Sequence, residues 1–188
     1  MEYICSECGR REPVTTKKAK CLCGGLWKLS CEPPKFDLEK VDRDIWGLFR
    51  YRAFLALEGD TWKEITMGEG MTPVVPLDED VLLKMDYFMP TLSFKDRGAV
   101  VLAAHCKAIG VKQVVQDSSG NAGNSVAAYC GKAGISCEIF VPEGTSPKKI
   151  TMIRSHGASV HVIPGNREAC AAACRRKVEE EGIYYASH

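Results

Sequence analysis

The sequence predicts an α/β fold in which a doubly wound parallel sheet follows a short zinc-ribbon-like segment. Short apolar strands alternate with helices through the second half of the chain, which is the pattern of βα units. These strands are apolar on both sides, as a parallel sheet covered by helices on both faces requires. Near the N-terminus, four cysteines have the spacing of metal ligands. We therefore divide the chain into residues 1–32, 33–92 and 93–188.

Each helix and strand is predicted from its hydrophobic pattern. Residues 33–43 read as a linker, and residues 43–58 have the apolar periodicity of a helix, marked by Trp46, Phe49, Phe54 and Leu57. The segment "VLLKMDYF" at 81–88 is a predicted strand. Beyond it we predict helices at 94–109, 121–134, 146–155 and 166–181, and strands at 112–118, 136–141, 159–163 and 183–187.

Composition argues against several classes of partner. The 188 residues are 45% hydrophobic, which is enough to bury a core. Lys and Arg number 25 against 24 Asp and Glu, so there is no basic excess to attract nucleic acid or an anionic membrane. We find neither a signal peptide nor an apolar run of the roughly 20 residues that a membrane span needs. We therefore expect a cytoplasmic protein with no nucleic-acid or membrane partner.

The cysteines fall into two groups. Cys5 and Cys8 form a C-x2-C pair, and Cys21 and Cys23 form a C-x-C pair before two glycines. Four thiolates can bind one Zn²⁺ tetrahedrally, and such a closed site is structural because no position is left for water or substrate. Cys31 is near enough to replace one ligand, and a cluster of free thiols is the alternative. Five other cysteines lie in apolar patterns and are expected in the core: Cys106, Cys130, Cys137, Cys170 and Cys174.

A lysine in "PTLSFKDRG" is the first candidate catalytic residue. Ser93 and Asp96 have the spacing of a capping box, so we expect Ser93 to be the N-cap and Lys95 to lie in the first helical turn. The helix dipole and burial beside Phe94 would favour the neutral amine, which is a nucleophile. The alternative is an ordinary lysine whose amine extends into solvent.

The segment "SSGNAGNS", residues 118–125, is the second candidate site. It follows a predicted strand and enters a helix, where free backbone N–H groups and small residues suit an anion such as a carboxylate. An ordinary strand-to-helix turn is the alternative. The segment matches neither of the glycine patterns that bind dinucleotides or nucleoside triphosphates.

Together, "PTLSFKDRG" and "SSGNAGNSVAAY" resemble the fold-type II pyridoxal-phosphate enzymes, most closely the threonine synthase family. The resemblance extends over nearly the whole chain and includes the cysteine-rich start. It implies that Lys95, beside Phe94, binds pyridoxal phosphate covalently and later exchanges a proton at the substrate α-carbon. It also implies that Asn121 donates a hydrogen bond to the cofactor's 3'-oxygen. The substrate carboxylate would be held by Ser118, Ser119, Gly120, Asn121 and Ala122.

The resemblance further implies a reaction and a domain arrangement. The reaction of this family converts O-phosphohomoserine and water to threonine and phosphate, with the cofactor as electron sink. Residues 33–92 would then begin a large domain, residues 93–188 would form a small mobile domain, and a homo-oligomer is possible. Asp96 and Arg97 are expected to be structural. Leu92 stands where the family commonly has glycine, so the approach of the backbone to the cofactor or substrate is expected to differ in detail.

The resemblance covers only the N-terminal portion of such an enzyme. The chain ends at His188, before a glycine-rich loop for the cofactor phosphate and a hydroxyl for the pyridine nitrogen. We therefore expect the 188-residue chain to fold but to be inactive by itself, with Lys95 unmodified and near the surface. The enzymatic alternatives are amino-acid dehydratases, ammonia-lyases and cysteate-forming enzymes. A non-catalytic interaction module, in which a zinc ribbon is joined to a Rossmann-like domain, is the alternative from another class.

Overall fold

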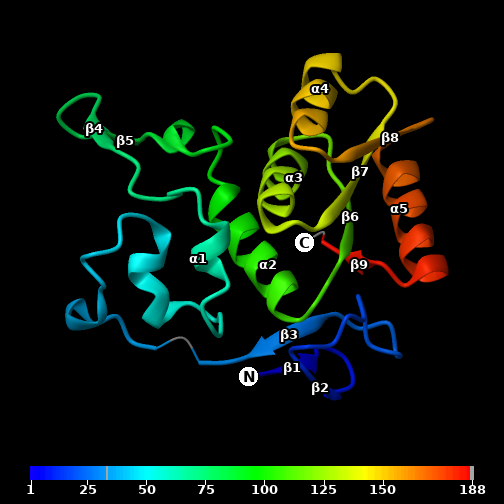
Figure 1. Ribbon diagram of the computed structural model, residues 1–188, viewed down its shortest axis with the longest axis horizontal. Coiled ribbons are helices and arrows are strands. Elements are labelled where there is room, and N and C mark those ends of the chain that lie inside the picture. The colour runs from blue at the N-terminus through cyan, green and yellow to red at the C-terminus, as the bar shows by residue number, and fades with distance from the viewer. Residues whose placement is uncertain (33, 187–188) are drawn as a thin grey trace.

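The computed structural model describes residues 1–32 and 34–186. The N-terminal segment forms a three-stranded antiparallel sheet of β1 (Glu2–Cys5), β2 (Arg11–Pro13) and β3 (Trp27–Ser30), in the order β2-β1-β3. A one-turn helix α1 (Trp62–Ile65) and a small hairpin of β4 (Val74–Pro76) and β5 (Leu82–Lys84) follow. Figure 1 shows the hairpin and the N-terminal sheet on different sides of helix α2 (Asp96–Ala108).

The second half of the chain is a regular βα alternation, as predicted. Its elements are α2 (Asp96–Ala108), β6 (Gln113–Asp117), α3 (Asn121–Ala133), β7 (Ser136–Pro142), α4 (Pro147–Ser155), β8 (Ser159–Ile163), α5 (Arg167–Glu181) and β9 (Tyr184–Tyr185). The four strands are parallel, in the order β8-β7-β6-β9. The predicted α/β fold class is therefore confirmed.

Alternating side chains of the strands supply two separate cores. Val114 on β6 belongs to the large core, which includes α2 and α3 residues, whereas the next residue, Val115, packs with Cys170 and Cys174 of α5. Successive residues of a strand point to opposite faces, so helices cover this sheet on both sides (Figure 1). All five cysteines expected in the core are buried.

Two elements predicted between residues 33 and 92 are wrong. The expected helix at 43–58 is only a kinked 3-10 helix, Leu48–Phe54, and Trp46 is 74% exposed. Gly47, at φ 139°, interrupts the helical path because the backbone N–H of Leu48 donates instead to the Glu69 carbonyl, at 2.7 Å. Tertiary contact with a distant segment therefore overrides the local pattern.

The predicted strand at 81–88 is also mostly wrong. Only Leu82–Lys84 forms a strand, and Asp86–Phe88 is a 3-10 turn. The turn brings the Asp86 carboxylate to Arg97, whose two terminal nitrogens donate at 2.8 and 2.9 Å. The first residue of the expected linker and the end of the expected strand at 183–187 lie outside the described residues.

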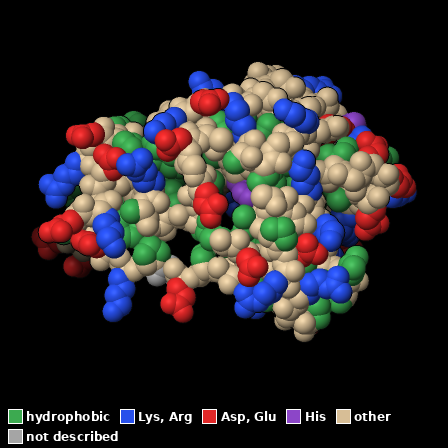
Figure 2. Space-filling model, turned by 60° about the horizontal axis from the view of Figure 1, so that its bottom comes forward, with side chains coloured by type: hydrophobic (Ala, Val, Ile, Leu, Met, Phe, Trp, Pro, Cys, Tyr) green, Lys and Arg blue, Asp and Glu red, His purple; other side chains and the backbone are tan. Residues whose placement is uncertain are grey.

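The surface carries interspersed charges. Figure 2 shows Lys and Arg side chains mixed with Asp and Glu over one face of the molecule, which is hollowed near its centre. This mixture fits the near balance of 25 basic and 24 acidic residues. Within the described residues, no helix is long and apolar enough to cross a membrane.

Candidate active site and metal centre

The start of α2 is held by a buried carboxylate. Asp96 is fully buried and accepts hydrogen bonds from the backbone N–H of Thr91 at 2.7 Å and from its hydroxyl at 2.5 Å. The hydroxyl of Ser125, on α3, donates to the same carboxylate at 2.5 Å. Donors of this kind compensate for the loss of water around a buried charge. The sequence-based expectation that Asp96 is structural agrees with this geometry.

The structure places Lys95 at the N-cap of α2, so the predicted start of this helix is wrong by two residues. Ser93 is not the assigned N-cap, although its hydroxyl accepts a hydrogen bond from the Lys95 backbone N–H at 3.3 Å. The expected capping box fails because the Asp96 side chain turns back to Thr91 and not to Ser93.

The amine of Lys95 lies beside the Phe94 ring. Its side chain is half-buried, and Nζ lies 5.1 Å from the centre of the Phe94 ring. Phe94 is itself 55% exposed, so the burial expected beside this ring is not observed. No ion pair involves Lys95 within the part of the chain that the structure describes. The Lys95 amine therefore has no charged partner among the described residues and contacts the Phe94 ring.

Leu92, which stands just before Ser93, has a left-handed backbone. Its φ is 62° and its side chain is 65% exposed. An L-residue other than glycine, asparagine or aspartate rarely adopts this conformation. Leu92 therefore has a backbone conformation that favours glycine, although the residue is not glycine.

The segment 118–121 leads directly from β6 into α3. Gly120 is the N-cap of α3 and makes no side-chain capping bond, so first-turn N–H groups have no capping side chain. Gly123 permits the tight turn, since a Cβ there would lie only 2.3 Å from the Ser118 carbonyl oxygen. Asn121 is exposed, and Ser118, Ser119, Gly120 and Ala122 are half-buried. The N–H groups and hydroxyls of this loop are the donors that a carboxylate requires.

Asn124, which the sequence reasoning did not single out, lies one turn into α3. It is 6% exposed, and its Oδ1 atom is buried without a hydrogen-bond partner among the described residues. With Gly120, Asn121 and Lys149 it lines a cavity of about 30 Å³, which is large enough for one water molecule. An unpaired polar atom beside the candidate carboxylate loop fits a site that binds a polar group.

A second buried carboxylate, that of Glu69, connects another segment of the chain to α3. Glu69 is fully buried and accepts hydrogen bonds from the hydroxyls of Tyr129 and Thr66, both at 2.8 Å. Burial, followed by the charge of Glu69, raises the pKa of the Tyr129 hydroxyl. The "GEGMTPVVPL" segment is thereby fixed to α3. Sequence reasoning missed this pair, although a tyrosine within an apolar helix could have indicated a hydrogen bond.

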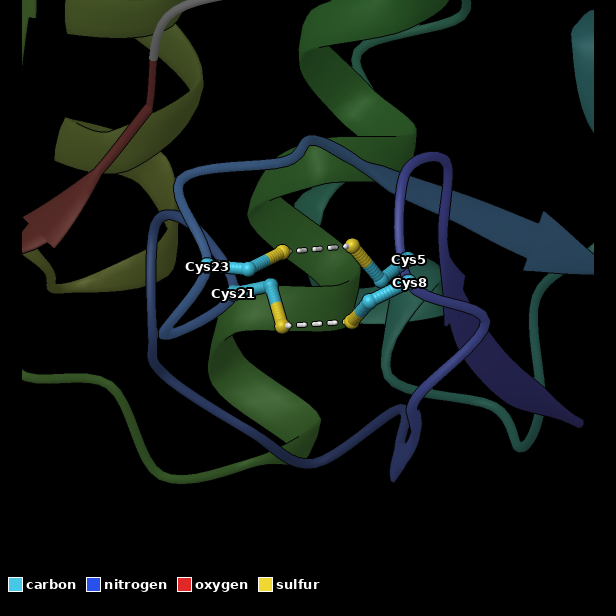
Figure 3. A group of neighbouring side chains, drawn as sticks. All are labelled: Cys5, Cys8, Cys21 and Cys23. Carbon is cyan, nitrogen blue, oxygen red and sulfur yellow. Dashed lines mark hydrogen bonds between the residues drawn. The ribbon is translucent and has the colours of Figure 1, made fainter.

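The four N-terminal cysteines meet at one point, as Figure 3 shows. The sulfur atoms of Cys5 and Cys23 are 3.4 Å apart, those of Cys8 and Cys21 are 3.6 Å apart, and all four lie within 4.8 Å of one another. Zinc–sulfur bonds of about 2.3 Å in a tetrahedron place the sulfurs about 3.8 Å apart. The donor set and spacing therefore fit one metal ion.

The backbone around these cysteines is also suited to a metal. Gly25 approaches the site so closely that a Cβ there would lie 2.6 Å from the Cys5 sulfur. A backbone hydrogen bond from Cys8 lowers the pKa of the Cys5 thiol to about 6. Cys31 is exposed and lies outside the four-cysteine cluster. The structure thus favours Cys5, Cys8, Cys21 and Cys23 over a ligand set that includes Cys31.

Comparison with known proteins places these features in a family. Residues 65–188 match the family model described as pyridoxal-phosphate dependent enzyme. The chain is 28% identical to the threonine synthase of Methanocaldococcus jannaschii over 96% of this chain and 47% of that protein. It is 30% identical to the threonine synthase of Methanosarcina acetivorans, with the same coverage, and 36% identical to that of Mycobacterium leprae over 63% of this chain and 35% of that protein. The chain thus spans less than half the length of these relatives.

Solved structures share the fold. The diaminopropionate ammonia lyase of Escherichia coli aligns with a TM-score of 0.59 and 18% identity, over 66% of this chain and 39% of that one. An O-ureido-L-serine synthase aligns with a TM-score of 0.58 and 23% identity, over 69% of this chain and 44% of that one. At these identities the likeness extends to the fold alone.

Proposed function

Because the chain belongs to the family of pyridoxal-phosphate dependent enzymes, we propose that Lys95 binds pyridoxal phosphate covalently and that the 118–122 loop binds the carboxylate of an amino-acid substrate. One observation carries the proposal. The hydrogen bond from Ser125 to Asp96 fastens α3 to the first residue of α2, so the helix starts that carry Asn121 and Lys95 belong to one buried network. The starts of α2 and α3, which are separate in the sequence, are therefore connected next to the Lys95 amine.

The residues present suit the cofactor. Lys95 supplies an amine without an ion-pair partner in the described chain, and Asn121 supplies an exposed amide that can donate to the 3'-oxygen of the cofactor. When bound, pyridoxal phosphate supplies an electron sink for charge that develops at the substrate α-carbon. Lys95 would hold and return the proton at that carbon, and the loop N–H groups would orient the carboxylate. Phe94, whose ring lies beside the Lys95 amine, would pack against the cofactor.

For the substrate, we propose O-phosphohomoserine, and for the activity of the whole protein a lyase of the threonine synthase type. Support comes from the two threonine synthases that are 28% and 30% identical over 96% of this chain. Residue roles at Lys95 and Asn121 would be shared by dehydratases and ammonia-lyases as well, so the substrate must be tested by direct binding. We propose a cytoplasmic location because the suggested reaction belongs to amino-acid biosynthesis.

The test of the proposed cofactor site uses covalent capture. The full-length protein mixed with pyridoxal phosphate should acquire a visible absorption band that borohydride removes, and peptide mass spectrometry should then locate the reduced adduct on Lys95. Lys95→Ala should lose both signals, whereas Lys132→Ala, an exposed lysine of α3, should keep them. An adduct spread over several lysines, or one that persists in Lys95→Ala, would refute the assignment.

The substrate is tested separately, by NMR titration of the chain, in an excess of pyridoxal phosphate, with O-phosphohomoserine, homoserine and 2,3-diaminopropionate. We expect O-phosphohomoserine to shift the amide signals of Ser119 and Gly120 at the lowest concentration. Equal or stronger responses to 2,3-diaminopropionate would favour an ammonia-lyase. No response to any amino acid would contradict the assignment of the loop.

We further propose that Cys5, Cys8, Cys21 and Cys23 bind one structural Zn²⁺. Four thiolates complete the coordination, so the metal has no role in the reaction. The protein prepared without chelators should contain about one equivalent of zinc by mass spectrometry of the metal. Cys8→Ser should lower this value, whereas Cys31→Ser should leave it unchanged. Less than half an equivalent in the unaltered protein would overturn the proposal.

A further inference from the structure

A lysine of α4 lies beside the candidate carboxylate loop. Helix α4 packs against α3, and residues at the starts of both helices line one cavity of about 30 Å³ (Figure 1). Gly120 and Asn121 contribute to its wall from the start of α3, and Lys149 contributes from the first turn of α4. The loop and this lysine are therefore neighbours, although α3 and β7 separate them in the sequence.

The charge of Lys149 is not balanced by a neighbouring carboxylate. Its side chain is exposed, and it forms no ion pair within the part of the chain that the structure describes. The first turn of α4 contains no acidic residue, and the described residues that line the cavity include none. Lys149 is therefore a cation whose counter-charge has to come from outside the described chain.

Two helix starts add to the positive potential around Lys149. The N-terminus of a helix carries partial positive charge, which makes the first turn unfavourable for a cation. Lys148 and Lys149 nevertheless occupy the first turn of α4, and the side chain of the N-cap residue Ser146 forms no capping hydrogen bond. The start of α3 also lacks a capping side chain. An anion with two negative charges would gain more from this arrangement than a single carboxylate would.

Asn124 can add a hydrogen-bond donor from inside the cavity. Its side chain lines the cavity, is 6% exposed and forms no hydrogen bond with a described residue. A ligand cannot reach the Oδ1 atom, which is fully buried, whereas Nδ2 is not enclosed in this way. An amide N–H donates to the oxygen of an anion. A cavity of this size accommodates one such oxygen, and the exposed Lys149 lies beside it.

We propose that Lys149 binds the phosphate of O-phosphohomoserine and thereby selects this substrate over amino acids without a second anionic group. The inference rests on the proposed function, in which the loop at 118–122 binds the substrate carboxylate. Three carbon atoms and one ester oxygen separate the carboxylate from the phosphate, so one molecule can extend from the loop to the neighbouring lysine. A phosphate monoester has close to two negative charges at neutral pH, which suits the lysine and the two helix starts.

The experiment compares two amino acids that differ only by the anionic group, 2-amino-5-phosphonopentanoate and norvaline. The phosphonate replaces the ester oxygen by a carbon atom, so no phosphate is released while binding is measured. Both are titrated by calorimetry into the full-length protein in an excess of pyridoxal phosphate. We expect the phosphonate to bind at least about tenfold more tightly than norvaline, because a charge-assisted contact separates them.

Lys149→Met should remove this preference. The affinity for the phosphonate should fall about tenfold or more, and the affinity for norvaline should not change. Lys148→Met removes the same charge from the adjacent exposed residue, which does not line the cavity, and should keep most of the preference. Lys149→Arg should also keep it. An equal loss for both amino acids in Lys149→Met would place the lysine at the carboxylate, and an equal effect of Lys148→Met would indicate only diffuse charge; either result would overturn the inference.

Two further measurements separate this inference from the proposed function. Borohydride capture should still label Lys95 in Lys149→Met, since the cofactor amine is a different residue. If neither amino acid binds the unaltered protein, the proposed function fails, and inorganic phosphate then probes Lys149 alone. Phosphate binding that Lys149→Met loses and Lys148→Met keeps would support the anion contact at Lys149. Phosphate binding that is absent, or equal in these two variants and the unaltered protein, would refute it.

Discussion

Ser125, one turn into α3, donates a hydrogen bond of 2.5 Å to the buried carboxylate of Asp96, the first residue of α2. This bond joins two segments that are separated in the chain by a helix and a strand. Asp96 has no exposed surface, so Ser125 and Thr91 supply the hydrogen-bond donors that water would supply at the surface. The candidate active site therefore relies on a structural pair that would not itself touch the substrate.

Removing the Ser125 hydroxyl should destabilise the protein. Ser125→Ala leaves the buried Asp96 carboxylate with one donor fewer, and hydrogen bonds to charged groups are worth about 1.5–3 kcal/mol. We expect the free energy of unfolding in urea to fall by this amount. Ser119→Ala, in the half-buried loop nearby, should change it by less than about 0.5 kcal/mol. Similar values for both variants would contradict the role of the Ser125–Asp96 bond.

Two glycines of the same loop should respond differently to alanine. In Gly123→Ala the new Cβ would lie 2.3 Å from the Ser118 carbonyl oxygen, so the backbone must shift. We expect a loss of stability of about 1–3 kcal/mol, as for overpacked sites. Gly120 has φ −122° and open space around a Cβ, so Gly120→Ala should fold with nearly unchanged stability. Thermal unfolding of the two variants checks this contrast, which equal melting temperatures would disprove.

The Asp86–Arg97 ion pair should make stability depend on acidic pH. The hydrogen bonds from Arg97 lower the pKa of the Asp86 carboxyl from 3.8 to about 2. A carboxyl whose pKa is lowered on folding stabilises the protein fully above about pH 4, and this contribution is lost as the pH falls toward 2. Both side chains are about one-third exposed, so solvent screening reduces the effect to roughly 1 kcal/mol.

This pH dependence is measured by urea unfolding between pH 5 and pH 2. Arg97→Met should lower stability at pH 5 and should flatten the decline below pH 4, because the pKa of Asp86 then returns toward its ordinary value. Arg11→Met removes an exposed ion pair with Glu2 and serves as the control, with little expected change. A decline of equal steepness in Arg97→Met and the unaltered protein would show that other carboxyls dominate.

Gly25 should control metal affinity more than folding of the body. In Gly25→Ala the Cβ would lie 2.6 Å from the Cys5 sulfur. A free thiol can turn aside, but a sulfur fixed on Zn²⁺ cannot, so we expect weaker zinc binding in competition with a chelator. Lys20→Ala, an exposed change in the same segment, should bind zinc normally. Equal zinc affinity in both variants would be inconsistent with metal coordination by Cys5.

The candidate site could be predicted from sequence only where its residues form continuous motifs. Lys95 and the 118–122 loop each stand in a short segment with local signals of a helix start or a glycine-rich turn. Glu69, Asn124 and Ser125 were missed, because their roles depend on partners that are distant along the chain. The polar pair within the apolar run of α3 could have indicated Asn124 and Ser125, and the tyrosine in the same helix could have indicated the bond to Glu69.

The sequence alone determined the βα alternation, the covered parallel sheet and the cysteine ligand spacing, since each depends on a period or interval within a short segment. Tertiary structure decided where those segments begin and end. Contact with Glu69 reduces the expected helix at 43–58 to a 3-10 turn, and the Thr91–Asp96 bonds accompany a start of α2 two residues later than its pattern predicts. Buried polar groups require hydrogen-bond partners, and some of these partners are distant along the chain. Long-range hydrogen bonds therefore set helix and strand boundaries that local hydrophobic periodicity does not predict.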